Sequence, residues 1–400
     1  MKPFLKLRRL QDIDLRQKRV LVRVDFNVPM ENGRVSDASR IKATLPTLNY
    51  LIEQKAKIAL ISHLGRPKEG EHDRFSLMPV AAVLKQLLGR EVLFSENCVG
   101  PQALEKVKEL GSGEVCLLEN LRFYPQEEAN DAEFAKTLSQ YGEVFVQEAF
   151  GSLHRAHAST DGIPKHLPGA IGFLVQRELE FLERVVNNPE RPFLAIIGGA
   201  KVSDKILVLR RLMERVDMLI IGGGMAYTFL EAQGVNIGNS LLEKDRLREA
   251  QEIIERAYSR RVDFLLPADH VMVEKIDPAA KIEVSQAMGL RSGMIGVDIG
   301  PNSVEIFEDR IEKAKTIFWN GPMGIFEMPP FSKGSLAIAK AVAAATERGA
   351  VTIVGGGDSL ALLTQSRLRD QITHCSTGGG ASLELLEGKV LPGLAALAYS

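Results

Sequence analysis

Short apolar runs alternate with longer amphipathic segments along the whole 400-residue chain, and this alternation constrains its fold more than any other feature. Most runs consist of β-branched or aliphatic residues without interruption, as do strands that are covered on both faces. Helical patterns such as 40–54, 245–261 and 335–349 lie between them. This order predicts parallel sheets with helices on both sides. The expected strands are 19–24, 57–62, 91–94, 113–118, 143–147, 192–197, 218–221, 262–266, 295–299, 316–319 and 351–354.

So many strands exceed one ordinary sheet, and the chain is long enough for two or three domains. Residues 173–192 have the pattern of a linking helix that ends in Asn-Asn-Pro. We therefore predict an α/β fold made of two doubly wound, Rossmann-like parallel-sheet domains joined by a hinge helix. The expected bounds are 1–172 for the first domain, 173–190 for the hinge and 191–379 for the second domain.

The bulk composition excludes several classes of protein. A formal net charge of -1 gives no general attraction to nucleic acid or to a membrane surface. Cys98, Cys116 and Cys375 are odd in number and form no C-x-x-C pair, which favours reduced thiols over disulfides or a zinc site. No stretch approaches the ~18 apolar residues of a membrane span, and the N-terminus lacks the apolar run of a signal peptide. We expect a cytoplasmic protein that binds neither nucleic acid nor membrane.

Polar and cationic groups follow the strands of the first half, where ligands of open α/β sheets collect. Arginine matches phosphate or carboxylate oxygens with two hydrogen bonds, so four arginines at such positions predict a small ligand with more than one negative charge. Asp25 and Asn27 could then bind its hydroxyl groups. The alternative is that each arginine forms a surface ion pair. His154 and His157 fit a role in packing or in loop hydrogen bonds as well as a role as ligands. The strand-end set is Asp25, Asn27, Arg40, His63, Arg66, Arg122 and Arg155.

Glycine clusters follow the strands of the second half and each leads into a helical pattern. Glycines let backbone N–H groups approach phosphates, and helix N-termini favour negative charge. None of the clusters fits G-x-G-x-x-G, because Tyr227, Leu360 and Leu383 stand where the last glycine should be. A nucleotide cradle is therefore favoured over a dinucleotide site. The clusters lie at 198–199, 222–224, 355–357 and 378–380.

The loop at 355–357 lacks the lysine that follows a P-loop, so its positive charge must come from elsewhere. Lys201 and Lys205 stand four apart at the start of a predicted helix and should share one face. Asp358 could hold Mg²⁺ beside nucleotide phosphates. The alternatives are a solvated helix face paired with Asp204, and a helix N-cap for Asp358. An anion site in one half and a nucleotide site in the other predict direct phosphoryl transfer after hinge closure.

Ten ordered segments between residues 23 and 389 resemble the phosphoglycerate kinase family. They are "RVDFNVP", "SHLGRP", "LLENLRFYPQEEAND", "EAFGSLHRAHAST", "GGAKVSDKI", "GGGMAYTFL", "DIGP", "WNGPMGIFE", "GGGDS" and "STGGGASLELLEGK". The resemblance implies reversible transfer of the acyl phosphate of 1,3-bisphosphoglycerate to ADP, giving 3-phosphoglycerate and ATP with Mg²⁺. It also implies a cytoplasmic monomer whose tail, 380–400, returns to pack on the first domain.

The resemblance further implies three residue sets. The first domain would bind 3-phosphoglycerate through Asp25, Phe26, Asn27, Arg40, His63, Leu64, Gly65, Arg66, Arg122 and Arg155. The second would bind the nucleotide through Gly199, Ala200, Lys201, Lys205, Gly296, Asn320, Pro322, Glu327, Gly356, Gly357, Asp358 and Ser359, with the metal on Asp358. In the second set Glu327 would hold the ribose, and Gly296 and Pro322 would line the base pocket. The catalytic groups would be Arg40, Lys201, Gly378, Gly379 and Gly380.

Two positions depart from the family pattern. Glu148 stands where the family usually has aspartate, and Ser359 where threonine is common. Both replacements keep the chemical type, so no catalytic group is lost. Two other readings stay open: a kinase for another small carboxylic acid, and a nucleotide-binding protein without catalysis.

Overall fold

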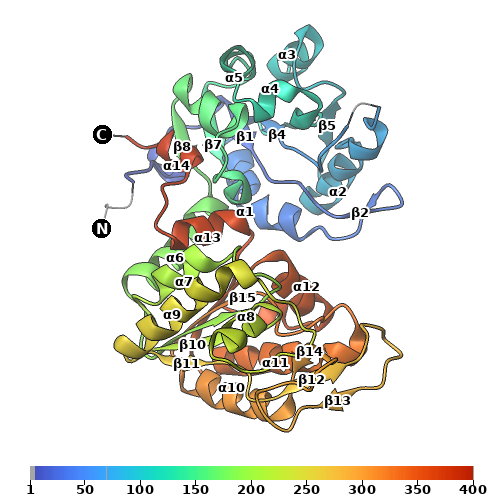
Figure 1. Cartoon of the computed structure of the whole chain (residues 1–400). Helices are drawn as coiled ribbons and strands as arrows, with labels where there is room; N and C mark the ends of the chain where they lie inside the picture. The colour runs from blue at the N-terminus through green and yellow to red at the C-terminus, as the bar shows by residue number, and fades with distance from the viewer. Residues whose placement is uncertain (1–4, 69, 400) are drawn as a thin grey trace. The chain divides into compact units, whose positions relative to one another are not determined.

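The computed structural model describes residues 5–68 and 70–399, which form two compact units. The first consists of Met1–Glu180 together with Val390–Ser400, and the second of Phe181–Lys389. Each unit has a central parallel sheet covered by helices (Figure 1). The boundary between the units falls inside α6 (Phe173–Asn187), the helix expected from the pattern at 173–192.

The sheet of the first unit has six parallel strands in the order β5-β6-β4-β1-β7-β8. Five of them lie at the predicted apolar runs. The sixth, β8, is three residues long and was not predicted, because Gly169, Ala170 and Ile171 are too few to form an apolar run. The strands are β1 (Arg19–Arg23), β4 (Lys57–Ile61), β5 (Val92–Ser95), β6 (Val115–Leu118), β7 (Val144–Gln147) and β8 (Gly169–Ile171), with a separate hairpin of β2 (Met30–Glu31) and β3 (Arg34–Val35).

Helices cover both faces of this sheet. The buried residues of α1 and α2 share one apolar core with β1, β4 and β6. Short helical turns follow β6 and β7 and carry polar residues at the carboxyl edge of the sheet. The helices are α1 (Ser39–Glu53), α2 (Met78–Leu88), α3 (Pro101–Lys108), α4 (Pro125–Glu128) and α5 (Ala132–Ser139), with turns η3 (Leu121–Phe123), η4 (Phe150–Ser152) and η5 (Ala158–Gly162).

The sheet of the second unit also has six parallel strands, in the order β11-β10-β9-β15-β16-β17. The apolar run at 295–299 forms a strand, β14, but the prediction that it joins a parallel sheet is wrong. It pairs antiparallel with β12 in a separate three-stranded sheet. The strands are β9 (Phe193–Ile197), β10 (Met218–Ile221), β11 (Asp263–Leu265), β12 (His270–Val273), β13 (Glu283–Val284), β14 (Ile295–Ile299), β15 (Thr316–Asn320), β16 (Val351–Gly355) and β17 (His374–Cys375).

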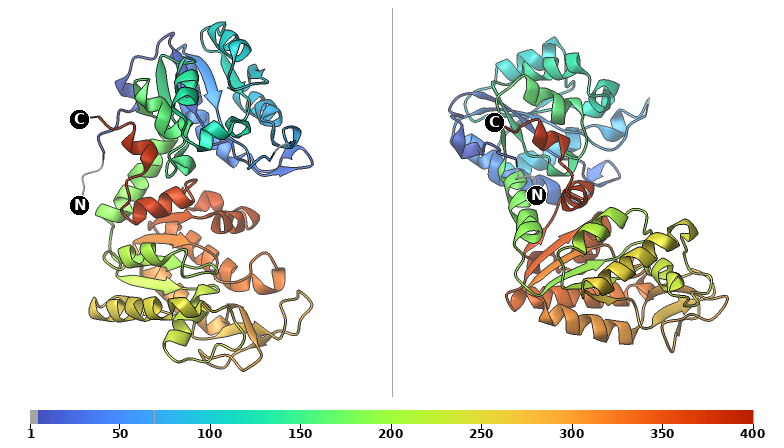
Figure 2. Two further views of the ribbon diagram at one scale, coloured as in Figure 1. Left: turned by 45° about the horizontal axis from the view of Figure 1, so that its top comes forward. Right: turned by 60° about the vertical axis from the view of Figure 1, so that its left-hand side comes forward.

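The helices of the second unit lie on both faces of its sheet (Figures 1 and 2). The buried faces of α10, α11 and α12 share a core with β9, β15 and β16. No described helix is long and apolar enough to cross a membrane. The helices are α7 (Ile206–Leu212), α8 (Met225–Ala232), α9 (Leu247–Ser259), α10 (Pro301–Lys313), α11 (Lys333–Glu347), α12 (Gly357–Gln365) and α13 (Gly380–Leu386).

The end of the chain is shared between the two units. The helix α13 packs against α7 in the second unit, so residues 380–389 stay there. The segment that packs on the first unit begins at Val390 and contains α14 (Pro392–Ala395). It lies next to β8, where a Cβ atom built on Gly169 would come within 2.3 Å of the Leu397 side chain (Figure 1).

Candidate active site

In the first unit, the loops after β1 and β4 place Asp25 and His63 close together. The two strands are parallel neighbours with Arg23 paired to Ile61, so the residues that follow leave the sheet side by side. Arg40, at the start of α1, donates from Nη1 to Asp25 Oδ2 at 2.6 Å. Burial alone would raise the pKa of Asp25, but the positive charges of Arg40 and Arg23 and the hydrogen bond from the Asn27 N–H bring it below its ordinary value. Asp25 is therefore a carboxylate that holds Arg40 in place.

The loop after β4 is held from two sides at Gly65. Asn27 Oδ1 accepts a hydrogen bond from the Gly65 N–H at 2.8 Å, and Arg122 Nη1 donates to the Gly65 carbonyl at 2.6 Å. Gly65 has φ of +61°, and a Cβ atom there would lie 2.2 Å from the ring of Phe75. Only glycine suits this close approach. The predicted residues Asn27, Gly65 and Arg122 are thus joined by direct hydrogen bonds.

Asn120 fixes the position of Arg122 and was not predicted as a site residue. Its Oδ1 accepts from the N–H groups of Leu64 at 3.2 Å and Arg122 at 3.0 Å, and its Nδ2 donates to the Leu64 carbonyl at 2.8 Å. The Arg122 side chain also pairs with Glu128, with Nε 3.3 Å from Oε1. The asparagine lies two residues after the end of β6, which is the same strand-end signal that pointed to its neighbours.

The predicted arginines differ in their surroundings. Arg40 and Arg122 each have a carboxylate partner, Asp25 and Glu128. Arg66 is exposed, and no carboxylate among the described residues lies within ion-pair distance of it. Arg155 is half-buried and donates from Nε to His154 Nε2 at 3.3 Å. Arg66 and Arg155 thus make no described bond to the cluster of Asp25, Asn27, Arg40, Gly65 and Arg122. The remaining predicted residue of the acid set, Phe26, is buried and donates its N–H to Ser62 Oγ.

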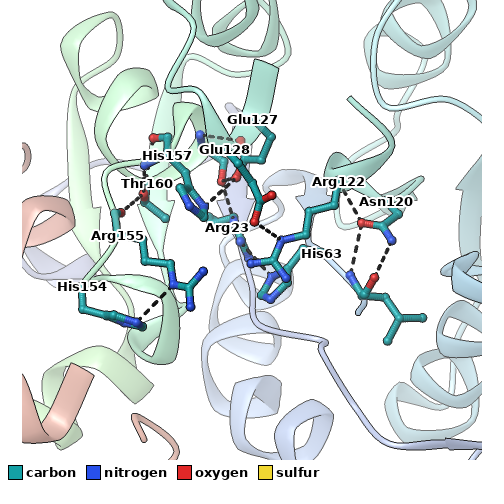
Figure 3. Close-up of polar contacts among 12 residues, drawn as sticks. Arg23, His63, Asn120, Arg122, Glu127, Glu128, His154, Arg155, His157 and Thr160 are labelled. Carbon is teal, nitrogen blue, oxygen red and sulfur yellow. Dashed lines mark hydrogen bonds and ion pairs between the residues drawn. The ribbon is translucent and has the colours of Figure 1, made fainter. Parts of the chain in front are cut away.

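A second layer of polar groups lies buried behind His63 (Figure 3). Arg23, at the end of β1, donates from Nη2 to His63 Nδ1 at 3.0 Å and from Nε to Ser159 Oγ at 2.8 Å. Ser159 Oγ donates to Glu127 Oε1 at 2.5 Å. The sequence offered one signal for this layer, an arginine inside the otherwise apolar run 19–24. We read it as part of a strand rather than as part of a site. His157 is packed 3.8 Å from Glu127, and burial lowers its pKa to about 4.

In the second unit, Lys205 lies at the carboxyl edge of the sheet. Its Nζ donates to the carbonyl of Gly198 at 2.7 Å and to the carbonyl of Asn320 at 3.0 Å, and it also bonds Asn320 Oδ1. Burial lowers the pKa of Lys205 to about 8, although the charges of Asp358 and Asp204 oppose this. The predicted sharing of a helix face by Lys201 and Lys205 is wrong, because α7 begins only at Ile206.

Lys201 instead lies in the loop between β9 and α7, which Glu243 anchors. The Glu243 carboxylate accepts from the N–H groups of Val202 and Ser203 and from Ser203 Oγ. Lys201 itself is exposed, and the described part of the chain places no carboxylate within ion-pair distance of it. Its ammonium group is therefore available to a ligand.

The glycine loop after β16 leads into α12 and lies next to the unpaired side-chain amide of Asn320. Gly356 has φ of +92° and caps the helix, so the predicted N-cap alternative for Asp358 is wrong. Asp358 is exposed in the first turn, and none of the described residues bonds its carboxylate. A Cβ atom on Gly356 would lie 3.0 Å from Asn320 Nδ2, which is buried without a hydrogen-bond partner. The structure thus places a free amide donor and a free carboxylate beside the 355–358 loop.

The loops after β9 and β15 and the first turn of α12 meet around Gly321 and Gly199. Ser359 Oγ accepts from the Gly321 N–H at 2.7 Å, and the Pro322 carbonyl accepts from the Gly199 N–H at 3.0 Å. These bonds bring the predicted residues Gly199, Pro322 and Ser359 together with Lys205 and Asn320. Other members of the predicted set form no hydrogen bond to this group among the described residues: Gly296 on β14, Glu327 in the loop after β15, and Gly378, Gly379 and Gly380 at the start of α13.

Comparison with known proteins identifies the family. A model of the phosphoglycerate kinase family matches residues 10–389. A phosphoglycerate kinase from Elusimicrobium minutum is 51% identical over 393 residues, covering 98% of each chain. The chain belongs to the phosphoglycerate kinase family. The chloroplastic phosphoglycerate kinase of Volvox carteri is 50% identical over 96% of this chain and 84% of its own.

Solved structures of phosphoglycerate kinases have the same fold. The enzyme from Coxiella burnetii matches with a TM-score of 0.87 and 41% identity, covering 98% of this chain and 99% of that one. The predictions of two parallel-sheet α/β domains and of phosphoglycerate kinase are therefore confirmed. Membership makes this chain a phosphotransferase with a carboxyl group as acceptor, acting on 3-phosphoglycerate and adenine nucleotide.

Proposed function

We propose that the clusters of the two units act together in Mg²⁺-dependent, in-line transfer of a phosphoryl group from 1,3-bisphosphoglycerate to ADP. One observation carries the proposal. Carboxylate-held arginines occupy the strand ends of the first unit, while glycine loops with a buried lysine occupy those of the second. Phosphoryl transfer needs positioning and charge neutralisation rather than a protein nucleophile. Closure of the units about α6 would bring the two ligands together.

In the first unit, the acid would bind over the cluster around Gly65. Asp25 and Asn27 would accept and donate hydrogen bonds to its hydroxyl group, and His63 would contact it beside them. Arg66, Arg122 and Arg155 would bind the phosphate and carboxylate oxygens. The guanidinium groups of Arg66 and Arg155 support this assignment, because neither pairs with a carboxylate of the described residues. Backbone groups of Phe26, Leu64 and Gly65 would line the site.

In the second unit, the nucleotide phosphates would lie against the loops at 199–201 and 356–359, between Lys205 and Asp358. The unpaired Asn320 Nδ2 would donate to them. Gly296 and Pro322 would line the base pocket, and Glu327 would bind the ribose. A Cβ atom on Gly296 would lie 1.9 Å from Tyr227 Oη, so this wall admits no side chain.

Asp358 would hold the Mg²⁺ that accompanies the nucleotide. No group of three or more histidine, cysteine or acidic residues that could hold a metal occurs in the described ranges. A single carboxylate fits Mg²⁺, which in nucleotide sites keeps several waters and binds the substrate phosphates. When bound, the ion would neutralise phosphate charge. The exposed, unpaired Asp358 carboxylate supports this role.

Arg40 and Lys201 would flank the travelling phosphoryl group and offset the charge on its equatorial oxygens. The N–H groups at Gly378 to Gly380 would assist. Gly378 already donates to Ser376 Oγ at 3.2 Å, which leaves Gly379 and Gly380 as the better donors. We further propose a cytoplasmic monomer that uses small-molecule substrates and binds neither nucleic acid nor membrane.

The test is ATP-dependent phosphorylation of 3-phosphoglycerate, followed by a coupled reductive assay with Mg²⁺ and with a chelator. We expect metal-dependent turnover. Arg40→Ala should lower kcat by at least about 100-fold, because an interaction with the transferred group is lost. The nucleotide dissociation constant should not change, since Arg40 belongs to the other unit. The exposed Arg34, replaced by alanine, is the matched control. Nucleotide binding without turnover would favour another acid substrate or a non-catalytic protein.

A further inference from the structure

Each of the three guanidinium nitrogens of Arg23 has a hydrogen-bond partner inside the first unit. Arg23 is 1% exposed. Its Nε donates to Ser159 Oγ at 2.8 Å, and its Nη1 bonds the Val24 carbonyl. Its Nη2 lies 3.0 Å from His63 Nδ1, and Figure 3 shows the two side chains next to each other. Each nitrogen of the guanidinium group thus has a partner inside the protein, and burial keeps the side chain away from a ligand at the surface. Arg23 therefore differs from the four arginines assigned to the acid site.

The contact with Arg23 determines which ring nitrogen of His63 carries the proton. Arginine has five N–H donors and no acceptor, and it does not lose its proton in proteins. A hydrogen bond between Arg23 Nη2 and His63 Nδ1 therefore requires Nδ1 to be the acceptor. A neutral imidazole that accepts at Nδ1 carries its proton on Nε2.

We infer that Arg23 is a positioning residue that fixes His63 as the neutral tautomer with the proton on Nε2, so that the ring offers a hydrogen-bond donor to the acid. This rests on the proposed function, which assigns His63 to the acid site. None of the described residues accepts a hydrogen bond from His63 Nε2. With the opposite tautomer, Nε2 would be an acceptor and would repel the oxygens of an anionic substrate.

Glu127 and Ser159 hold Arg23 in this position. Ser159 Oγ accepts from Arg23 and donates to Glu127 Oε1 at 2.5 Å, and the Ser159 N–H donates to Glu127 Oε2 at 2.9 Å. Glu127 and Ser159 are both fully buried. Such a chain of hydrogen bonds, in which each donor points toward the next acceptor, is stiff and mutually strengthened. It runs from Glu127 on α4 through η5 to the end of β1.

The surroundings of His63 also oppose a charged ring. Burial lowers the pKa of His63 well below its ordinary value, and the charges of Arg23, Arg122 and Arg40 act in the same direction while Asp25 opposes them. A second proton would have to sit on Nδ1, facing the Arg23 N–H. The acid would thus meet a neutral N–H donor among arginine cations, which adds direction to the binding without adding charge.

The direct test is nitrogen NMR of the full-length protein labelled with ¹⁵N-histidine. His63→Gln assigns the His63 signals among the seven histidines. We expect a bare Nδ1 and a protonated Nε2 from about pH 6 to about pH 8, where an ordinary histidine titrates. A proton on Nδ1, or a doubly protonated ring in this range, would overturn the inference. The readout does not need turnover, so its failure is distinct from a failure of the proposed function.

Variants then test the positioning role. Arg23→Met should give His63 a mixture of tautomers and weaken 3-phosphoglycerate binding by roughly tenfold, the size of one lost hydrogen bond to a charged group. The nucleotide dissociation constant should stay unchanged. Arg23→Lys retains a cationic donor and should restore part of the binding. Arg19→Met, at the other end of the same strand, is the matched control.

Arg23→Met leaves Glu127 as a buried carboxylate without its cation, which could prevent folding. The double variant Arg23→Met/Glu127→Gln removes that charge and should show the same change in the His63 signals. A folded variant without Arg23 in which His63 keeps the protonated Nε2 and bare Nδ1 pattern would contradict the inference.

Discussion

Lys205 shows at the scale of one residue how burial prepares an ammonium group for an anion. Its Nζ bonds two backbone carbonyls and the side chain of Asn320 but forms no ion pair with a described carboxylate. Burial lowers its pKa from the ordinary value of 10.5 to about 8, and Asp358 and Asp204 only partly offset this. Nucleotide phosphates bound at this lysine would add negative charge and raise its pKa again.

We predict that ADP binding takes up protons when the pH lies above the pKa of the free protein. At about pH 9 Lys205 should be mostly neutral without ligand and charged with it, so binding should take up close to one proton. Calorimetry in two buffers with different ionisation enthalpies measures this number. In Lys205→Arg the group stays charged throughout, and the uptake should disappear. Equal uptake by this variant would assign the proton to another group.

Site residues could be predicted from the sequence where they follow an apolar run, and were missed where they lie inside one. Asp25, Asn27 and Arg122 follow apolar runs and stand out as polar groups at strand ends. Arg23 was missed because it lies within such a run, where a strand residue is the simpler reading. Its role depends on Ser159 and Glu127, which lie more than 100 positions away. No local pattern carries that information.

At the scale of elements, Glu148 joins three parts of the first unit at the start of α6. Its Oε1 accepts from Thr47 Oγ1 of α1 at 2.5 Å and from the Leu174 N–H of α6 at 3.1 Å. A Cβ atom on Gly172 would lie 1.9 Å from Glu148 Oε2, so only glycine fits between them. The departure from the family pattern at Glu148 is therefore located at the beginning of α6.

Glu148 should make stability depend on pH. Burial raises its pKa to about 8, although the bonds from Thr47 and the α6 backbone lower it. A carboxyl group whose pKa is raised on folding stabilises the protein below its unfolded pKa, and this stabilisation is lost as the pH rises toward 8. The free energy of unfolding should therefore fall by up to about 1.4 kcal/mol per pH unit in this range. Denaturant titrations at several pH values measure it.

The matched variant is Glu148→Gln, which keeps the shape of the protonated acid. Its unfolding free energy should lack this component of the pH dependence, so the difference from the wild type should grow from about pH 5 to about pH 8. Parallel curves for the two proteins would show that Glu148 ionises in the folded state at its ordinary pKa.

The elements could be predicted where they are long and apolar, and not where contacts between distant segments define them. All eleven apolar runs are strands, and the three helical patterns at 40–54, 245–261 and 335–349 are α1, α9 and α11. The strands β8 and β17, of three and two residues, are defined by pairing with β7 and β16. The direction of a strand is equally non-local. The run at 295–299 resembles the other apolar runs, and only its pairing with β12 makes β14 antiparallel.

At the scale of the whole molecule, the first unit is built from both ends of the chain. In the returning segment, Leu391, Leu394 and Leu397 are buried, and the Gly393 N–H donates to the Leu153 carbonyl at 3.1 Å. Tyr399 donates its N–H to the Lys6 carbonyl. The second unit uses one uninterrupted stretch, Phe181–Lys389.

Ending the chain after Lys389 should therefore destabilise the first unit alone. Burial of the three leucines contributes about 1.5–3 kcal/mol each, a large part of the stability of a domain. We expect the shortened protein to bind ADP normally and to lose 3-phosphoglycerate binding, as measured by calorimetry. Leu394→Ala should give a milder loss, and Val390→Ala, at an exposed position, should have no effect. Loss of ADP binding as well would mean that the units do not fold independently.

The returning segment also sets the order in which the molecule can be completed during its synthesis. Residues 181–389 are synthesised as one uninterrupted stretch, so the second unit has all its strands before Val390 is added. The first unit is completed later, because the leucines that close its apolar surface are translated after the whole of the second unit. During synthesis, the second unit can therefore be almost complete while the first unit still exposes the apolar surface beside β8.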